Sequence, residues 1–148
     1  MGYTMETDPE TSSKAYGREL PISPKKSVEV CKMVRGLDVN GAINILNEVI
    51  EGKRAVPYKR HKKQIAHQKG TGPGGYPKKV AKYVRDLIEE AKSNAEDKAL
   101  DSDNMRIISI AAHEGEEVKR NRPRAFGRSS AFNKKTTNLE VILQEKEA

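Results

Sequence analysis

The sequence of 148 residues has few residues that cross-link a chain or fill a large core, since it contains one cysteine, two phenylalanines and no tryptophan. A single cysteine, Cys31, permits no internal disulfide, which is typical of proteins kept in a reducing compartment. No apolar run approaches the ~20 residues of a membrane helix, and residues 1–20 lack the apolar stretch of a signal peptide. We therefore expect a soluble, cytoplasmic protein with no membrane partner.

Recognisable catalytic and ligand-binding motifs are also missing. His61 and His67 have no cysteine or carboxylate between them, so their spacing matches no metal site. The glycine run at 70–75 follows no predicted strand and lacks the Gly-Lys-Ser/Thr ending of a phosphate-binding loop. The acidic segment 113–117 could ligate a cation, although an exposed rim is the simpler interpretation. We expect no enzyme, no metal, no cofactor and no small-molecule substrate.

Acidic residues are absent from two long windows of the chain. Eleven Lys or Arg and no acid lie between Glu51 and Asp86, and seven Lys or Arg and no acid lie between Glu117 and Glu140. The rest of the chain has ten basic and twenty-one acidic residues, so the net charge of +7 is concentrated rather than general. Concentrated positive charge is typical of nucleic-acid binding. A solvated basic surface that serves solubility is the alternative, and two separate windows make it less favoured.

Three helices are predicted from apolar residues at helical spacing. Ser23-Pro24 can begin a helix over about 24–35, because serine caps first-turn amides and proline needs no partner there. Asp38 can begin a second helix that ends at Gly52. The third and longest helix opens at Tyr76-Pro77 and extends past Ala95.

Three strands are predicted, at residues 15–22, 105–112 and 139–143. In the second of them, Met105, Ile107, Ser109 and Ala111 alternate with the residues between them, which places these four on one face. An isolated hairpin is marginal in water, so one face of the sheet must be covered by helices. The predicted fold class is α+β, with three helices packed on a small three-stranded antiparallel sheet and a long protruding β-hairpin.

The chain is predicted to be a single domain, 1–148, with three special segments. Residues 1–13 form an N-terminal arm that we expect to be mobile unless a partner holds it. Residues 53–76 form a basic, glycine-rich loop without periodicity, and loops of this length are usually functional or disordered. Residues 113–138 form an extended hairpin finger.

The finger has a predicted internal geometry. If residues 119–135 fold back near Phe126-Gly127, each arm has about eight residues, and at ~3.3 Å per residue the tip reaches roughly 25 Å beyond the sheet. Pro123 lacks an amide donor, which predicts that regular pairing fails near the tip. A basic finger of this length requires a polyanion to neutralise it.

The candidate nucleic-acid-binding residues are the cations of both windows, of which seventeen are assigned to the site. They are Lys53, Arg54, Lys59, Arg60, Lys62, Lys63, Lys69, Lys78, Lys79, Lys82, Lys119, Arg120, Arg122, Arg124, Arg128, Lys134 and Lys135. Pro123, Phe126, Gly127 and Phe132 are assigned to the shape of the finger and to stacking on bases, which is worth ~1–3 kcal/mol per base. The alternative for the two phenylalanines is packing that stiffens the tip.

Several motifs resemble one family. They are Lys119-Arg-x-x-Pro-Arg-Ala-Phe-Gly-Arg128, the preceding segment 107–115, Ala91-Lys-Ser-Asn-Ala-Glu96, Ser23-Pro-Lys-Lys26, Val56-Pro-Tyr58 and Tyr76-Pro-Lys-Lys79. Over nearly the whole chain they resemble the universal large-subunit ribosomal protein twenty-two family, which is numbered seventeen in eukaryotes. The insertion at about 59–75 and the N-terminal arm resemble the archaeal and eukaryotic branch.

The resemblance implies a structural constituent of the large ribosomal subunit that binds large-subunit rRNA and aids assembly. It implies that the hairpin finger lines the nascent-polypeptide exit tunnel, with neighbouring large-subunit proteins and the nascent chain as further partners. A free-standing RNA chaperone or architectural nucleic-acid-binding protein is the main alternative. A small RNA-processing enzyme that uses Glu114 or Glu117 is a third.

Overall fold

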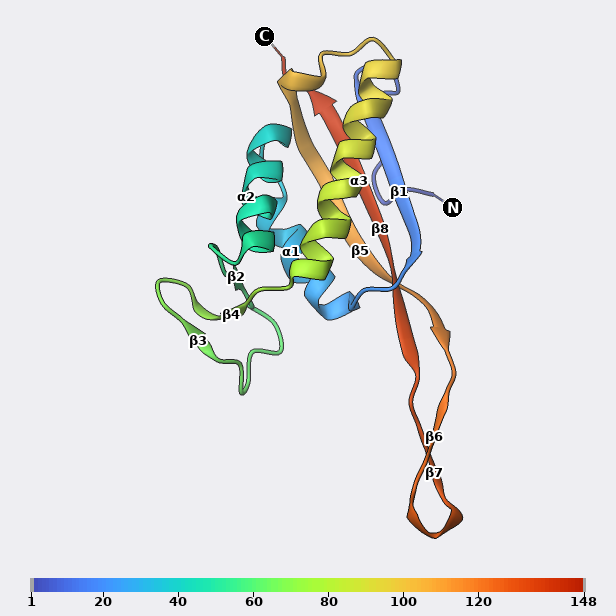
Figure 1. Cartoon of the computed structure of the whole chain (residues 1–148). Helices are drawn as coiled ribbons and strands as arrows, with labels where there is room; N and C mark the ends of the chain where they lie inside the picture. Colours follow the sequence, from blue (N-terminus) through green and yellow to red (C-terminus); the bar gives the residue numbers. More distant parts are fainter. Residues whose placement is uncertain (1, 148) are drawn as a thin grey trace.

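A three-stranded antiparallel sheet with the strand order β1-β8-β5 carries three helices on one face (Figure 1). The computed structural model describes residues 2–147. The elements of the body are β1 (Ser12–Leu20), α1 (Pro24–Val34), α2 (Val39–Glu51), α3 (Lys78–Asp97), β5 (Met105–Val118) and β8 (Lys134–Glu145). The predicted α+β class, the three helices and the three-stranded sheet are confirmed.

The helix boundaries agree with the prediction within about two residues. α1 has proline at its first position, α2 follows Asp38, and Gly52 ends α2 with a left-handed φ of 79°. Glycine is favoured there because a side chain strains this backbone region. α3 has seven buried residues at helical spacing along its apolar face, as the pattern of the sequence predicts.

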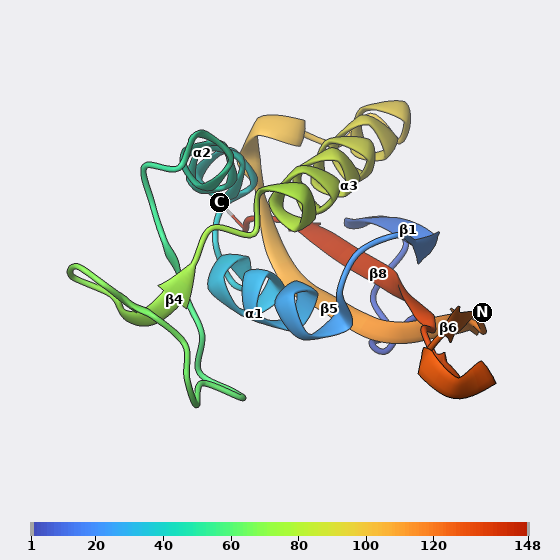
Figure 2. The ribbon, with the colours of Figure 1, turned by 60° about the horizontal axis from the view of Figure 1, so that its bottom comes forward.

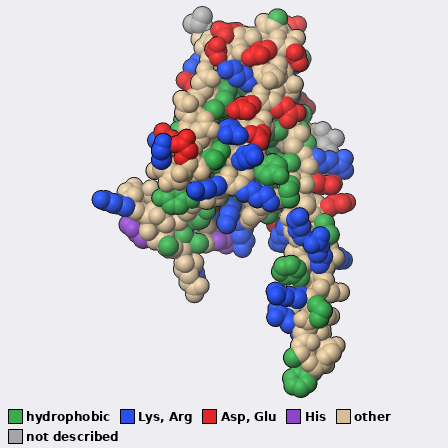
Figure 3. Space-filling model, in the orientation of Figure 1, with side chains coloured by type: hydrophobic (Ala, Val, Ile, Leu, Met, Phe, Trp, Pro, Cys, Tyr) green, Lys and Arg blue, Asp and Glu red, His purple; other side chains and the backbone are tan. Residues whose placement is uncertain are grey.

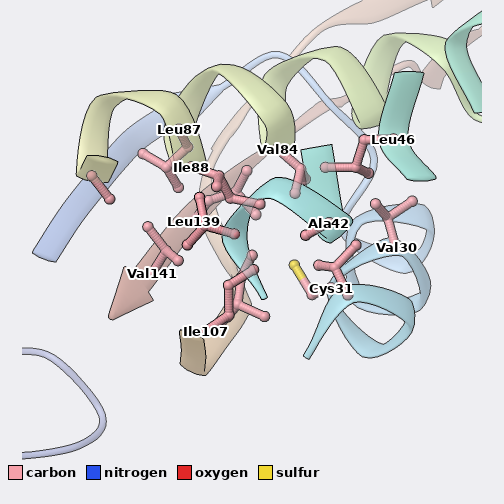
Figure 4. Close-up of a cluster of buried hydrophobic side chains, with 14 of the residues drawn as sticks. Val30, Cys31, Ala42, Leu46, Val84, Leu87, Ile88, Ile107, Leu139 and Val141 are labelled. Carbon is pink, nitrogen blue, oxygen red and sulfur yellow. The ribbon is translucent and has the colours of Figure 1, made fainter. Parts of the chain in front are cut away.

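The core lies between the sheet and the three helices (Figure 4). Leu87 and Ile88 of α3 face Leu139 and Val141 of β8, and all four are at most 4% exposed. Cys31 of α1 is in the same cluster. Its burial raises the pKa of the thiol to about 12, which agrees with its interpretation as a small buried residue.

The predicted alternation in β5 is wrong beyond Ile107. Ile107 pairs with Leu143 but Ser109 pairs with Ile142, so Ile108 bulges out of the register. Ile110, rather than Ser109, therefore joins Ile107 in the core, and Ser109 is only half-buried.

The N-terminal segment lies on the sheet. Residues 12 and 13, assigned to the arm by the prediction, are the first residues of β1. The Thr4 amide donates to both carboxylate oxygens of Glu140 at 3.2 and 3.3 Å, and the ring of Tyr3 meets Tyr16 edge to face. Glu140 and Ile142 of β8 are buried although they alternate with the core residues of that strand. The structure thus gives the arm a binding surface within the chain itself.

The long loop predicted over residues 53–76 contains short strands that the sequence pattern did not indicate. Three short strands form a second sheet with the order β2-β4-β3: β2 (Val56–Pro57), β3 (His67–Gln68) and β4 (Gly72–Gly75). A Cβ on Gly74 would lie 2.6 Å from the Val56 carbonyl oxygen, so only glycine allows this close approach. The glycine run is therefore a strand that pairs closely, and we call residues 53–76 the basic loop below.

The finger is a hairpin that continues β5 and β8 beyond the helices (Figure 1). Its outer pair is β6 (Asn121–Pro123) and β7 (Ser129–Ala131), and the chain reverses through a short helical turn over Ala125–Gly127. The predicted reversal near Phe126-Gly127 is confirmed. The strand ladder includes Pro123, which pairs with Ser129, and ends there, so the predicted failure of regular pairing near the tip is limited to residues 124–128. Proline is tolerated there because only one neighbouring strand is present.

Candidate nucleic-acid interface

The basic loop and the finger project from the same end of the body (Figure 3). Lys and Arg side chains gather on the part of the finger nearest the body and on the surface between the two extensions, with others on the basic loop, whereas most acidic side chains in this view lie toward the other end, over the C-terminal half of α3. Viewed from the extended end, α1 lies between the basic loop and the finger (Figure 2). The molecule therefore has one cationic end with two arms.

Most of the predicted cations have no acidic partner. Of the seventeen, Lys53 pairs with Glu51, Arg54 with Glu48, and Lys135 lies 3.9 Å from Glu114. Among the described residues, no ion pair forms at the other fourteen: Lys59, Arg60, Lys62, Lys63, Lys69, Lys78, Lys79, Lys82, Lys119, Arg120, Arg122, Arg124, Arg128 and Lys134. Cations left without internal partners can neutralise an external polyanion.

The first half of α3 adds a cationic helix face between the two arms. Lys78, Lys79 and Lys82 lie in its first two turns, where the helix dipole disfavours positive charge by a few tenths of a kcal/mol per exposed group. Arg85 differs from them, because its guanidinium donates to Asp86 and to Asn47 at 2.9 and 3.1 Å. Arg85 is thus held by the protein, and the first three lysines remain available.

A buried carboxylate fixes the start of the basic loop. Glu29 of α1 is 5% exposed, and its oxygens accept hydrogen bonds from the Arg60 amide at 2.9 Å and the Lys59 amide at 3.3 Å. A carboxylate is stable when buried only if donors satisfy it. The sequence analysis missed this residue, because Glu29 has no local signal and its role depends on a segment thirty residues away.

The cations of the finger lie on a two-stranded hairpin that no described helix covers. The Arg122 guanidinium lies 5.7 Å from the centroid of the Phe132 ring, and Arg124 Nε donates to Ser130 Oγ at 2.9 Å. Phe132 therefore packs against the opposite arm, which can stiffen the tip. The residue is still 59% exposed, so its ring can also stack on a base.

The tip presents an aromatic side chain to solvent. Phe126 is 98% exposed and has a left-handed φ of 59°, followed by Gly127 with φ 65°. A phenylalanine in this backbone region is uncommon. The sharp reversal aims its ring away from the hairpin, where no described residue packs on it.

The remaining candidate residues form no metal or membrane site. In the part of the chain that the structure describes, no group of three His, Cys, Asp or Glu residues is placed to hold a metal ion. The described helices include none that is long and apolar enough to cross a membrane. His113 lies 3.7 Å from Glu140, at the base of the finger.

Comparison with known proteins shows which family this chain resembles. Residues 15–144 match the family described as ribosomal protein L22p/L17e. The chain is 41% identical to the "Large ribosomal subunit protein uL22" of Methanococcus aeolicus, covering 98% of this chain and 97% of that protein. It is 46% identical to the protein of the same name from Methanococcoides burtonii (97% and 95% covered) and 43% identical to that of Picrophilus torridus (97% and 96% covered). The chain therefore belongs to the ribosomal protein L22p/L17e family.

Proposed function

We propose that this chain is a structural constituent of the large ribosomal subunit in the cytoplasm, where it binds large-subunit rRNA and aids assembly. The observation that carries the proposal is the set of fourteen cations without an acidic partner on the two arms and on the first turns of α3. Folded RNA presents phosphates at the junctions of its helices, and proteins recognise it largely by shape. Two arms with a cationic surface between them suit such a junction.

The family consists of structural ribosomal proteins rather than enzymes, as expected from the absence of catalytic motifs. The alternative of an RNA-processing enzyme that uses Glu114 or Glu117 is therefore not favoured.

The finger is proposed to line the nascent-polypeptide exit tunnel. A two-stranded hairpin is narrow enough to extend between RNA helices, and the exposed ring of Phe126 at its tip can contact a passing chain or stack on a base. The body would then contact neighbouring large-subunit proteins. A photoreactive residue at position 126 is expected to crosslink to a stalled nascent chain if the side chain contacts that chain, and to rRNA if it stacks on a base. Crosslinks to neither would contradict a tunnel position.

The salt dependence of binding tests the rRNA interface. The isolated protein should bind a large-subunit rRNA fragment with an affinity that falls by ~0.7–0.9 log units per phosphate contact for each log unit of salt. Replacing Arg122, Arg124 and Arg128 with alanine together should lower the slope by ~2–3. Salt-independent binding would refute the proposal.

A matched control removes the same charge elsewhere. Arg18, Lys92 and Lys146 pair with Glu19, Asp103 and Asp38, so their joint replacement by alanine should leave the slope nearly unchanged. An equal loss of slope in this control would show that net charge, rather than the finger, sets the affinity.

Cofractionation separates the proposal from a free-standing RNA chaperone or architectural nucleic-acid-binding protein. A constituent of the subunit should remain with the large subunit through a sucrose gradient. A chaperone should be washed off, and that result would favour the alternative.

A further inference from the structure

A cavity lies where the basic loop crosses the start of α1. It has two adjacent lobes, each of about 160 Å³, and both are lined by Lys25, Glu29, Arg60 and His61. In one lobe, Tyr58 and Ile65 of the basic loop complete the wall with apolar surface. Of the residues that line it, only Arg60 is among the seventeen cations assigned above to nucleic-acid binding.

The cavity is built into the fold, because the buried Glu29 carboxylate holds the Lys59 and Arg60 amides over α1. The adjacent backbone has unusual conformations, with left-handed φ values of 49° at His61 and 64° at Gln64. Backbone strain of this kind is found preferentially at functional sites.

The charges around the cavity are arranged for a ligand with one anionic and one neutral part. In the lobe walled by Tyr58 and Ile65, Lys25, Lys26 and Arg60 form no ion pairs within the described part of the chain, and the other lobe adds the carboxylate of Glu114. Each Glu29 oxygen accepts one backbone amide and retains a further lone pair. The field of Glu29 reaches the cavity wall, since burial and this carboxylate together raise the pKa of Tyr58.

We infer that this cavity is a binding pocket for one unstacked pyrimidine nucleotide of the RNA, with cytosine preferred. The lobe walled by Tyr58 and Ile65 measures about 160 Å³, close to the ~150 Å³ of an apolar cavity known to accept a benzene ring, so it can accept one six-membered base. Unstacked bases are commonly bound against aromatic side chains, and Tyr58 and His61 are both available. Carboxylates accept from the N4 amino group of cytosine, whereas uracil presents a carbonyl oxygen there and would be repelled by Glu29. Lys25, Lys26 and Arg60 would contact the phosphate.

The inference rests on the proposed function, because it assigns one contact within the RNA interface. Its test is a titration of the full chain with short single-stranded RNAs, oligocytidine, oligouridine and oligoadenosine, followed by amide NMR shifts and fluorescence anisotropy. Oligocytidine is expected to bind about tenfold more tightly than the other two and to shift the amides of residues 58–65.

Two variants form a matched pair. Ile65→Glu and Gln68→Glu each add one carboxylate to the basic loop, but only position 65 lines the cavity. Ile65→Glu should weaken oligocytidine binding by roughly tenfold or more, as expected for the loss of one stacked base. Gln68→Glu should weaken it less than threefold. Equal effects of the two variants would overturn the pocket.

Glu29→Gln tests the preference between bases. The glutamine can still accept an amide hydrogen bond, and its own amide group can donate to the uracil carbonyl, so the ratio of oligocytidine to oligouridine affinities should fall toward one. An unchanged ratio in a folded variant would overturn the role of Glu29.

If all three RNAs bind equally with a normal salt slope, the pocket is refuted and the rRNA interface stands. If none of them binds and the rRNA fragment also fails to bind, both proposals fall.

Discussion

The two halves of the β5–β8 hairpin share their strands but not their surroundings. In the body, Ile107, Val141 and Leu143 are fully buried beneath the helices. In the finger, every residue from 119 to 129 is exposed, and seven cations lie on two narrow arms. The first half is stabilised by apolar burial, and the second by cross-strand pairing and a few exposed side-chain contacts such as Arg122 with Phe132. We expect from this difference that the body folds by itself and that the finger becomes ordered fully only against a polyanion.

The largest expected difference is in amide hydrogen exchange of the free protein. Amides of Ile107 and Val141 should exchange only through global unfolding, and so should be protected by ~10³-fold or more. Amides of residues 120–132 should be protected less than about tenfold, because like charges repel and isolated hairpins are marginal. Strong protection of the finger without RNA would contradict this comparison.

Two substitutions in one strand compare the halves directly. Ile107→Ala removes a fully buried side chain from β5 and should lower the free energy of unfolding by ~2–5 kcal/mol. Val118→Ala, at the finger end of the same strand, removes a side chain that is 45% exposed and should change it by about 0.5 kcal/mol or less. Urea unfolding measures both, and similar values would show that the finger belongs to the cooperative unit.

A substitution at the junction between the body and the finger should change the free energy of unfolding by an intermediate amount. A Cβ on Gly115 would lie 2.5 Å from Thr136 Oγ1, whose hydroxyl donates to the Glu116 carbonyl at 2.6 Å. Gly115→Ala must displace that hydroxyl and should destabilise the protein by ~1–3 kcal/mol.

A double-mutant cycle tests the cause at this junction. If the clash with the Thr136 side chain is responsible, adding Thr136→Ala to Gly115→Ala should recover part of the loss. Strictly additive effects in urea unfolding would point to the backbone of Gly115 instead.

The helices and the cations could be predicted because their signals are local. Helical spacing alone predicted α3 with its apolar stripe, and a basic stretch without acids between two predicted strands predicted the finger. The family resemblance rested on contiguous motifs, chiefly the segment 119–128. Each of these features can be recognised without knowing what lies across the fold.

The features that were missed depend on contacts between distant segments. The bulge at Ile108 is visible only against the register of β8, and the two-residue strands of the basic loop are too short to have a period. Glu29 lies on α1 between apolar neighbours, and only the folded chain brings the Arg60 amide to it. Local patterns therefore identified the cations that the described structure mostly leaves without acidic partners, whereas tertiary contacts determine how the basic loop is held.

The smallest expected effect lies within the finger. The Arg122 guanidinium over the Phe132 ring should contribute ~0.5–1 kcal/mol, the usual range for an exposed cation–π pair. Phe132→Leu keeps an apolar side chain but removes the ring, so it should lower the hairpin population of the free finger by roughly two- to fivefold and leave the urea midpoint of the body unchanged. Ring-current shifts of the Arg122 side chain measure the hairpin population, and urea unfolding measures the midpoint of the body. A shifted midpoint would mean that the finger is coupled to the body, because a side chain that contacts only the opposite arm can stabilise only the hairpin it belongs to.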